Sequence, residues 1–329
     1  MRTGCAGYHD GMPSAPPPLP SCASSSRTAT ILLTGASGFV GSELMPELQR
    51  SGQLRCFVRD AGRLGDAGSA SVHVGDLTEV DSLRSALTGT DAVYYLVHSM
   101  EPGGDTSYVE RDRLAAQTYT DVARECGVRR TTYLGGIAGG DDNSSEHLVS
   151  RREVEDVLST AGPEFVALRA SMIVGARSAS FGTLARIVDR LPVLAMPTWR
   201  DRRTQPIAVA DVVAALVTAQ TVEPGTYDIA GPDTLSFQEM TEIIAGIMGR
   251  RHRSFALPFS NAKLEGVAAA LITGEDSELL EPLMAGMHGD LTTRSNALAT
   301  VFAVTPTPFA EAARAAIDLM PDVGPTTEA

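Results

Sequence analysis

The chain has 329 residues, 43% hydrophobic and 20% charged, which is the ordinary composition of a folded globular protein. Its formal net charge of −13 disfavours phosphate backbones and anionic surfaces, so we expect no nucleic-acid partner. No apolar run reaches the roughly 18 residues that a transmembrane helix requires, and no membrane span is expected.

The cysteines and the N-terminal composition bear on the compartment. The four cysteines form no CxxC pair, which indicates neither a zinc site nor a disulfide framework and fits a reducing cytoplasm. Residues 1–28 are rich in proline and serine and lack the continuous apolar core of a signal peptide. We expect them to be a disordered extension.

From residue 29 to 170, short apolar segments alternate with amphipathic ones. Strands are expected at 30–34, 54–59, 71–74, 92–97, 131–134 and 165–169, and helices at 39–50, 81–87, 107–126 and 147–160. Such alternation predicts an α/β fold, a doubly wound parallel sheet with helices on both faces.

After residue 170 the pattern is less regular. Helices are expected at 180–191, 211–220, 236–248, 260–272 and 307–319, and short strands at 205–209 and 227–229. Ser236 and Glu239 have the spacing of a capping box for the third of these helices. We expect residues 171–320 to form a smaller substrate-binding cap, interleaved with the core, over the C-terminal edge of the sheet where ligands bind.

A glycine-rich loop directly follows the first predicted strand. In the segment TGASGFVG, Gly35 permits a tight turn, Gly38 lets the backbone approach a diphosphate, and Gly41 allows close packing of helix and strand. The start of the following helix supplies N–H groups and partial positive charge. This context indicates a Rossmann domain that binds a dinucleotide through Gly35, Ser37, Gly38, Phe39, Val40 and Gly41.

Residues after the second and third strands bear on the choice of dinucleotide. Arg59 suits a 2′-phosphate and can stack on adenine, which favours NADP(H) over NAD(H). Asp60 would weaken or reverse this preference if its side chain turned inward. Asp76, followed by Leu77, either accepts a hydrogen bond from the adenine amino group or caps the next helix.

These motifs resemble those of the atypical short-chain dehydrogenases/reductases, in particular the NmrA-like group. The resemblance rests on TGASGFVG, Val58-Arg59-Asp60 and Gly75-Asp76-Leu77, and a bacterial subgroup is similar through YYLVHSM at 94–100, LRASMIVG at 168–175 and RTQPI at 203–207. It covers residues 30 to 250, and less securely the chain to 320. It implies that Leu96, Val97 and His98 lie along the ribose and diphosphate of the cofactor, and we add Gly135 to the expected cofactor site.

The residues at the expected catalytic positions depart from the pattern of the wider superfamily. Active members use a serine after the fifth strand and a Tyr-x-x-x-Lys pair on the next helix, whereas this chain has Gly135 and Gly136, then His147 and Arg151. His147 and Arg151 share one helix face, so Arg151 could hold ribose hydroxyls and His147 could donate a proton. The alternative is a histidine at a helix start and a surface arginine.

Three functions follow from this sequence. The first is an NADPH-dependent oxidoreductase that reduces an apolar carbonyl or quinone in a pocket lined by Met172, Phe181, Met196 and Trp199, although these residues could equally be plain core. The second is a non-catalytic NADP(H)-binding redox sensor or regulatory protein, because the catalytic serine, tyrosine and lysine are absent and the resembling family includes such proteins. An isomerase or epimerase is less favoured, because sugar-nucleotide enzymes also tend to use the missing tyrosine. No metal site is indicated.

Overall fold

A seven-stranded sheet forms the centre of the computed structural model, which describes Met1 and residues 28–98, 108–137, 146–251, 253–257, 261–274, 289–293 and 295–323. The strand order is β11-β6-β5-β4-β1-β2-β3, and every neighbouring pair is parallel. The strands are β1 (Thr30–Thr34), β2 (Gln53–Val58), β3 (Ser71–Val74), β4 (Ala92–Tyr95), β5 (Arg130–Gly136), β6 (Glu164–Ala170) and β11 (Gly225–Ile229). The doubly wound α/β prediction is confirmed, and the order reverses between β1 and β4, where ligands bind in such folds.

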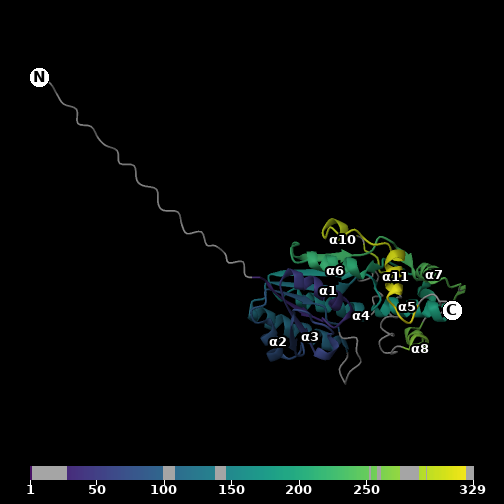
Figure 1. Cartoon of the computed structure of the whole chain (residues 1–329), viewed down its shortest axis with the longest axis horizontal. Helices are drawn as coiled ribbons and strands as arrows, with labels where there is room; N and C mark the ends of the chain where they lie inside the picture. The colour runs from purple at the N-terminus through teal and green to yellow at the C-terminus, as the bar shows by residue number, and fades with distance from the viewer. Residues whose placement is uncertain are drawn as a thin grey trace.

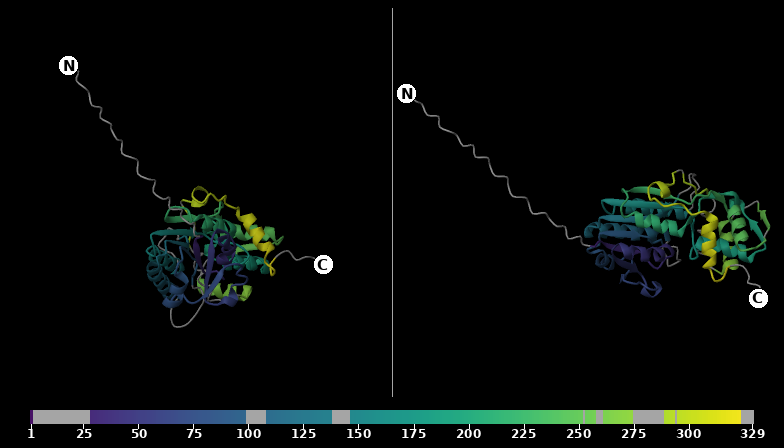
Figure 2. Two further views of the ribbon diagram at one scale, coloured as in Figure 1. Left: turned by 60° about the vertical axis from the view of Figure 1, so that its left-hand side comes forward. Right: turned by 45° about the horizontal axis from the view of Figure 1, so that its top comes forward.

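Helices cover both faces of this sheet (Figures 1 and 2). One face carries α1 (Phe39–Ser51), α6 (Val209–Thr218) and the short α10 (Ala297–Thr300), and the other carries α2 (Val80–Leu87), α3 (Tyr108–Cys126) and α4 (Glu146–Leu158). The apolar run of β1 is explained by this arrangement, because Ile31 and Leu33 pack on the first face and Leu32 on the second.

The C-terminal region builds a second apolar core beside the C-terminal ends of the strands. We call this region the cap; it consists of α5 (Ala179–Arg190), α7 (Phe237–Ile247), α8 (Ala262–Thr273), α11 (Phe309–Asp318) and a parallel ribbon of β8 (Val193–Met196) with β13 (Arg253–Ala256). Short pairs join it to the sheet: β7 (Ile173–Val174) with β10 (Ile207–Ala208), and β9 (Arg203–Thr204) with β12 (Leu235–Ser236). Two 3-10 turns complete the described elements, Ala61–Arg63 and Thr198–Asp201.

Most of the expected elements are present, with shifted boundaries. β4 ends at Tyr95 rather than at residue 97, because the backbone N–H of Leu96 turns to the hydroxyl of Thr34, at 3.2 Å. The strand expected at 205–209 is only two residues long, since α6 already begins at Val209. The capping box of Ser236 and Glu239 is confirmed. None of the described helices has the length and hydropathy to cross a membrane.

The placement of Phe181 in the substrate pocket was wrong. Its ring is fully buried in the cap core, edge-to-face with Phe309 at 6.4 Å between centroids. On α5 the positions that face the cavity are those at helical spacing from Ser180, namely Ser180, Thr183, Leu184 and Ile187. Phe181 is turned away from these positions around the helix and belongs to the same apolar core as residues of α7 and α11.

We predict that Phe181→Ala lowers the free energy of unfolding by about 3–5 kcal/mol, because it leaves a cavity in the cap core. Chemical denaturation measures this loss. Phe255→Ala, at a ring that is 50% exposed, is the matched control and should change stability far less. If Phe181→Ala lowers the free energy of unfolding as little as this surface variant does, the stability of the cap core does not depend on Phe181.

Candidate functional site

The loop between β1 and α1 presents backbone rather than side chains at the edge of the sheet. Gly35 has a φ of +71°, and a Cβ there would lie 2.9 Å from the carbonyl oxygen of Leu96. A Cβ at Gly41 would lie 2.1 Å from the carbonyl oxygen of Gly35. Gly38 precedes α1 without a side-chain cap, and the first N–H groups of a helix have no partner within it. The loop is therefore a backbone cradle suited to an anion.

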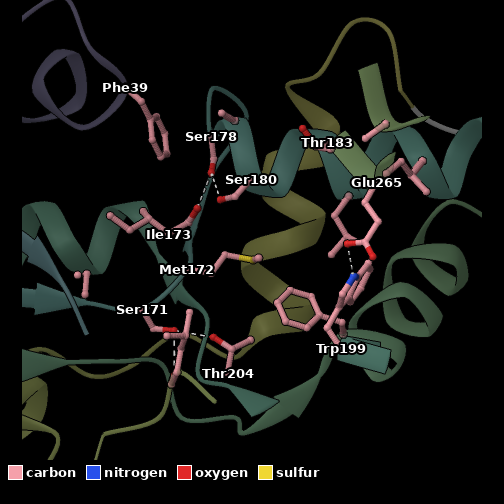
Figure 3. A pocket seen from close by; sticks show the side chains of 18 of the residues that line it. Phe39, Ser171, Met172, Ile173, Ser178, Ser180, Thr183, Trp199, Thr204 and Glu265 are labelled. Atoms are coloured by element: carbon pink, nitrogen blue, oxygen red, sulfur yellow. Dashed lines mark hydrogen bonds between the residues drawn. The ribbon is translucent and has the colours of Figure 1, made fainter. Parts of the chain in front are cut away.

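A cavity of about 770 Å³ begins at this loop and continues into the cap. Its floor is made by residues at the ends of the central strands: Leu96, His98, Leu134, Gly135, Gly136 and Ala170. Its far end is made by α5, β8 and α8, mostly through apolar side chains. Figure 3 shows Phe39 of the loop at one end, Met172 in the middle, and Trp199 beside Glu265 at the other. The phosphate cradle and the apolar chamber are thus one continuous space, of a volume typical for small-molecule sites.

Arg151 brings a buried positive charge to the floor of this cavity. Its Nε is buried and has no hydrogen-bond partner in the described part of the chain. Burial lowers the pKa of the Arg151 guanidinium, against the attraction of Tyr133 and Asp112. The helix backbone at this point is tied down, because the Tyr133 hydroxyl donates to the Arg151 carbonyl oxygen at 3.0 Å. A buried donor of this kind is costly to leave without a partner, so the Nε–H is available to a ligand in the cavity.

His98 brings a second unsatisfied atom to the same floor. Its Nε2 lies 3.0 Å from the Leu134 carbonyl oxygen, which requires the proton on Nε2. Its Nδ1 is buried and has no hydrogen-bond partner among the described residues; Asp112 Oδ2, at 3.9 Å, is within ion-pair distance only of a protonated ring. Burial, followed by the nearby Arg151, lowers the pKa of His98, so the imidazole is neutral at pH 7 and Nδ1 is an acceptor. A hydroxyl can both donate and accept, so ligand hydroxyls suit the Nε–H donor of Arg151 and the Nδ1 acceptor of His98.

Many of the residues predicted to form the site do line the cavity: Gly35, Gly38, Phe39, Val40, Gly41, Leu96, His98, Gly135, Arg151, Met172, Met196 and Trp199. Leu77 and Val97 instead pack into the core beneath α2 and α3. His147 lies in the first turn of α4, but its side chain is outside the described part of the structure.

The residues predicted to select the dinucleotide lie beyond this cavity. Arg59 is exposed after β2. Asp60 accepts a hydrogen bond from Gly62 N at 2.8 Å, which holds its carboxylate in its own turn. Asp76 Oδ1 accepts from the backbone N–H and the hydroxyl of Thr78, at 2.8 and 2.7 Å. Asp76 therefore shapes the turn before α2, while Glu79 occupies the N-cap position.

Two charged lining residues were missed by the sequence analysis. Glu265 Oε2 accepts from the indole Nε1 of Trp199 at 2.8 Å, and the Trp199 ring packs edge-to-face on Phe237 at 5.4 Å. Arg177, after β7, donates to the hydroxyl of Ser42 and to the carbonyl oxygen of Ser37. Glu265 is a single charged residue in α8 and Arg177 a single charged residue in the link between β7 and α5, and only the folded chain brings them to the cavity.

The comparisons with known proteins agree with this geometry. Residues 35–220, more than half of the chain, match the NAD(P)H-binding family. The chain belongs to this family. The prediction of a nicotinamide dinucleotide cofactor is thereby confirmed. Among the described residues no cluster of histidine, cysteine and carboxylate side chains is arranged to hold a metal.

One curated relative is named as a reductase, and another as a subunit of a respiratory enzyme. The (4-alkanoyl-5-oxo-2,5-dihydrofuran-3-yl)methyl phosphate reductase of Streptomyces griseus is 27% identical over 230 residues, 67% of this chain and 74% of the relative. An alpha-subcomplex subunit 9 of mitochondrial NADH dehydrogenase (ubiquinone) from Arabidopsis thaliana is 25% identical over 242 residues. That match covers 70% of this chain and 60% of the longer plant protein.

Two solved structures share the fold. The NADP(H) complex of the Citrobacter triphenylmethane reductase superposes with a TM-score of 0.68 at 19% identity, covering 87% of this chain and 99% of that one. An NADPH-dependent quinone oxidoreductase of Escherichia coli gives 0.65 at 19% identity, covering 86% and 98%. Together the comparisons support an oxidoreductase in general terms.

We predict that Gly41→Ala weakens NADPH binding by about tenfold or more, because its methyl group forces the start of α1 away from Gly35. Isothermal titration calorimetry measures the loss. Gly246→Ala on α7 is the matched control, since a Cβ there meets nothing within 4 Å. Undiminished affinity in Gly41→Ala would mean that the loop does not hold the diphosphate.

Proposed function

We propose that the chain is an NADPH-dependent oxidoreductase that reduces an apolar carbonyl or quinone. The observation that carries this proposal is the continuity of the backbone cradle with the apolar chamber. A dinucleotide that extends from the cradle over the ends of β4 and β5 would reach the chamber wall formed by Met172 and Trp199. The reductases among the relatives, including one that acts on quinones, support the same chemistry.

Arg59 would favour NADPH over NADH. It lies just beyond β2, on the side of the cradle where a Rossmann domain holds the adenosine ribose. The bond from Gly62 N keeps the Asp60 carboxylate in its own turn, which lessens its competition for that ribose. A guanidinium there matches a 2′-phosphate in charge and geometry.

Arg151 and His98 would orient the nicotinamide ribose. The Nε–H of Arg151 donates, and the neutral Nδ1 of His98 accepts, so two ribose hydroxyls would satisfy both buried groups. When bound, NADPH supplies a hydride to the electrophilic carbon or ring of the substrate. The remaining proton would come from His147 or from solvent, because the Nε2–H of His98 is committed to Leu134. Carbonyl plus hydride plus proton gives an alcohol, and a quinone gives a hydroquinone.

A non-catalytic redox sensor is the second candidate function. It is favoured by the floor of the cavity, where Gly135 and Gly136 offer no hydroxyl and Arg151 carries a permanent charge. A protein with this floor could bind NADP(H) without a side chain that donates a proton to a substrate. Measuring whether bound NADPH is oxidised in the presence of a substrate distinguishes the two functions.

We expect purified protein to oxidise NADPH in the presence of at least one member of a panel of apolar quinones and ketones, followed at the absorbance of the reduced nicotinamide.

Ala195→Phe, at an exposed position on the chamber wall, should lower kcat/KM by about tenfold or more and leave the NADPH Kd unchanged. Cofactor binding without turnover of any substrate would favour the sensor.

Arg151→Met should weaken NADPH binding by about tenfold or more while raising the thermal midpoint of the apo protein. The reason is that the variant removes a cation whose buried Nε–H has no hydrogen-bond partner among the described residues and would be satisfied by the ribose. Arg152→Met, exposed on the same helix, is the control and should alter neither quantity appreciably. A lowered midpoint with normal binding would make Arg151 purely structural.

A further inference from the structure

Arg177 brings a positive charge from the cap side onto the phosphate cradle. It lies between β7 and α5, far along the chain from the glycine-rich loop. Its Nη1 donates to Ser42 Oγ at 2.6 Å and its Nη2 to the Ser37 carbonyl oxygen at 3.4 Å. Both acceptors belong to the loop or to the first turns of α1, and Arg177 also lines the cavity.

The backbone that carries Arg177 is held against the cradle. A Cβ at Gly175 would lie 2.7 Å from Cζ of Phe39, so a larger residue there would push the Phe39 ring aside. On the other side, the Ser178 hydroxyl donates to the Ile173 carbonyl oxygen at 2.7 Å and caps the start of α5 (Figure 3). The position of the Arg177 backbone is therefore set by packing and capping, whereas its guanidinium is exposed.

The charge of Arg177 has no acidic partner in the described part of the chain. Both of its hydrogen bonds go to neutral oxygens, and no carboxylate of the described residues lies within ion-pair distance. Two other cap arginines do have such partners, Arg186 with Asp322 and Arg250 with Asp189, each at 2.8 Å. The first turn of α1 has no acidic residue either. Positive potential from the guanidinium and from the helix start thus adds up at one place.

We propose that Arg177 is a second clamp on the diphosphate of the dinucleotide, opposite the backbone amides of α1. A guanidinium matches a pair of phosphate oxygens, and the side chain can keep one bond to the loop while it turns the other N–H groups to the ligand. The diphosphate is common to NADPH and NADH, so this contact adds affinity for both. It is distinct from the role of Arg59, which concerns only the 2′-phosphate, and it does not depend on turnover.

The test is the affinity of Arg177→Gln for NADPH and NADH, measured by calorimetry over a range of salt concentrations. We expect both dissociation constants to rise by about ten- to a hundredfold, with their ratio unchanged and with a weaker salt dependence. Arg177→Lys should keep much of the affinity and the salt dependence, because it keeps the charge. Arg314→Gln, at an exposed position on α11, should behave as the wild type.

Four results would overturn the assignment. Unchanged affinity in Arg177→Gln would remove the residue from the site. A loss confined to NADPH would assign it to the 2′-phosphate instead. Equal losses with an unaltered salt dependence, or the same loss in Arg177→Lys, would mean that Arg177 only ties the loop in place. Because binding is the readout, failure of the proposed reductase activity would leave this test intact.

Discussion

The close approach of α1 to the ends of β1 and β4 is the constraint on which the rest of the site depends. Gly35 and Gly41 touch backbone so closely that a single methyl group would separate helix and strand. This contact aims the helix start at the point where the strand order reverses. The cavity floor, the cap connection at Gly175 and the position of Arg177 are all built against the same loop.

The floor of the cavity contains polar atoms whose burial costs folding free energy. Among the described residues, Arg151 Nε and His98 Nδ1 are buried without hydrogen-bond partners, an arrangement that a core selected only for stability would replace with apolar side chains. The Nε–H of Arg151 is a donor and Nδ1 of His98 is an acceptor. This complementary pair suits a polar ligand better than it suits a packed core. The apolar chamber beyond them contributes volume and exclusion of water rather than specific bonds.

Sequence reasoning succeeded where a pattern is local and failed where a contact is distant. The buried run of β1, the glycine spacing and the capping box at Ser236 each depend on neighbouring residues, and each was predictable. Phe181 was misplaced because apolar side chains on both sides of α5 look alike until α7 and α11 pack against one of them. Arg177 reaches Ser42 across 135 positions of the chain, and no local pattern encodes such a contact.

The placement of β11 in the central sheet makes the two halves of the molecule inseparable. This strand, at residues 225–229, pairs with β6, yet the chain must first pass through α5 and β8 of the cap to reach it. A fragment ending near residue 170 would leave the hydrogen-bonding edge of β6 bare, and bare edges promote aggregation. Replacing the cap as a block would therefore also disturb the edge of the central sheet, whereas single cap residues can be changed with the sheet left intact.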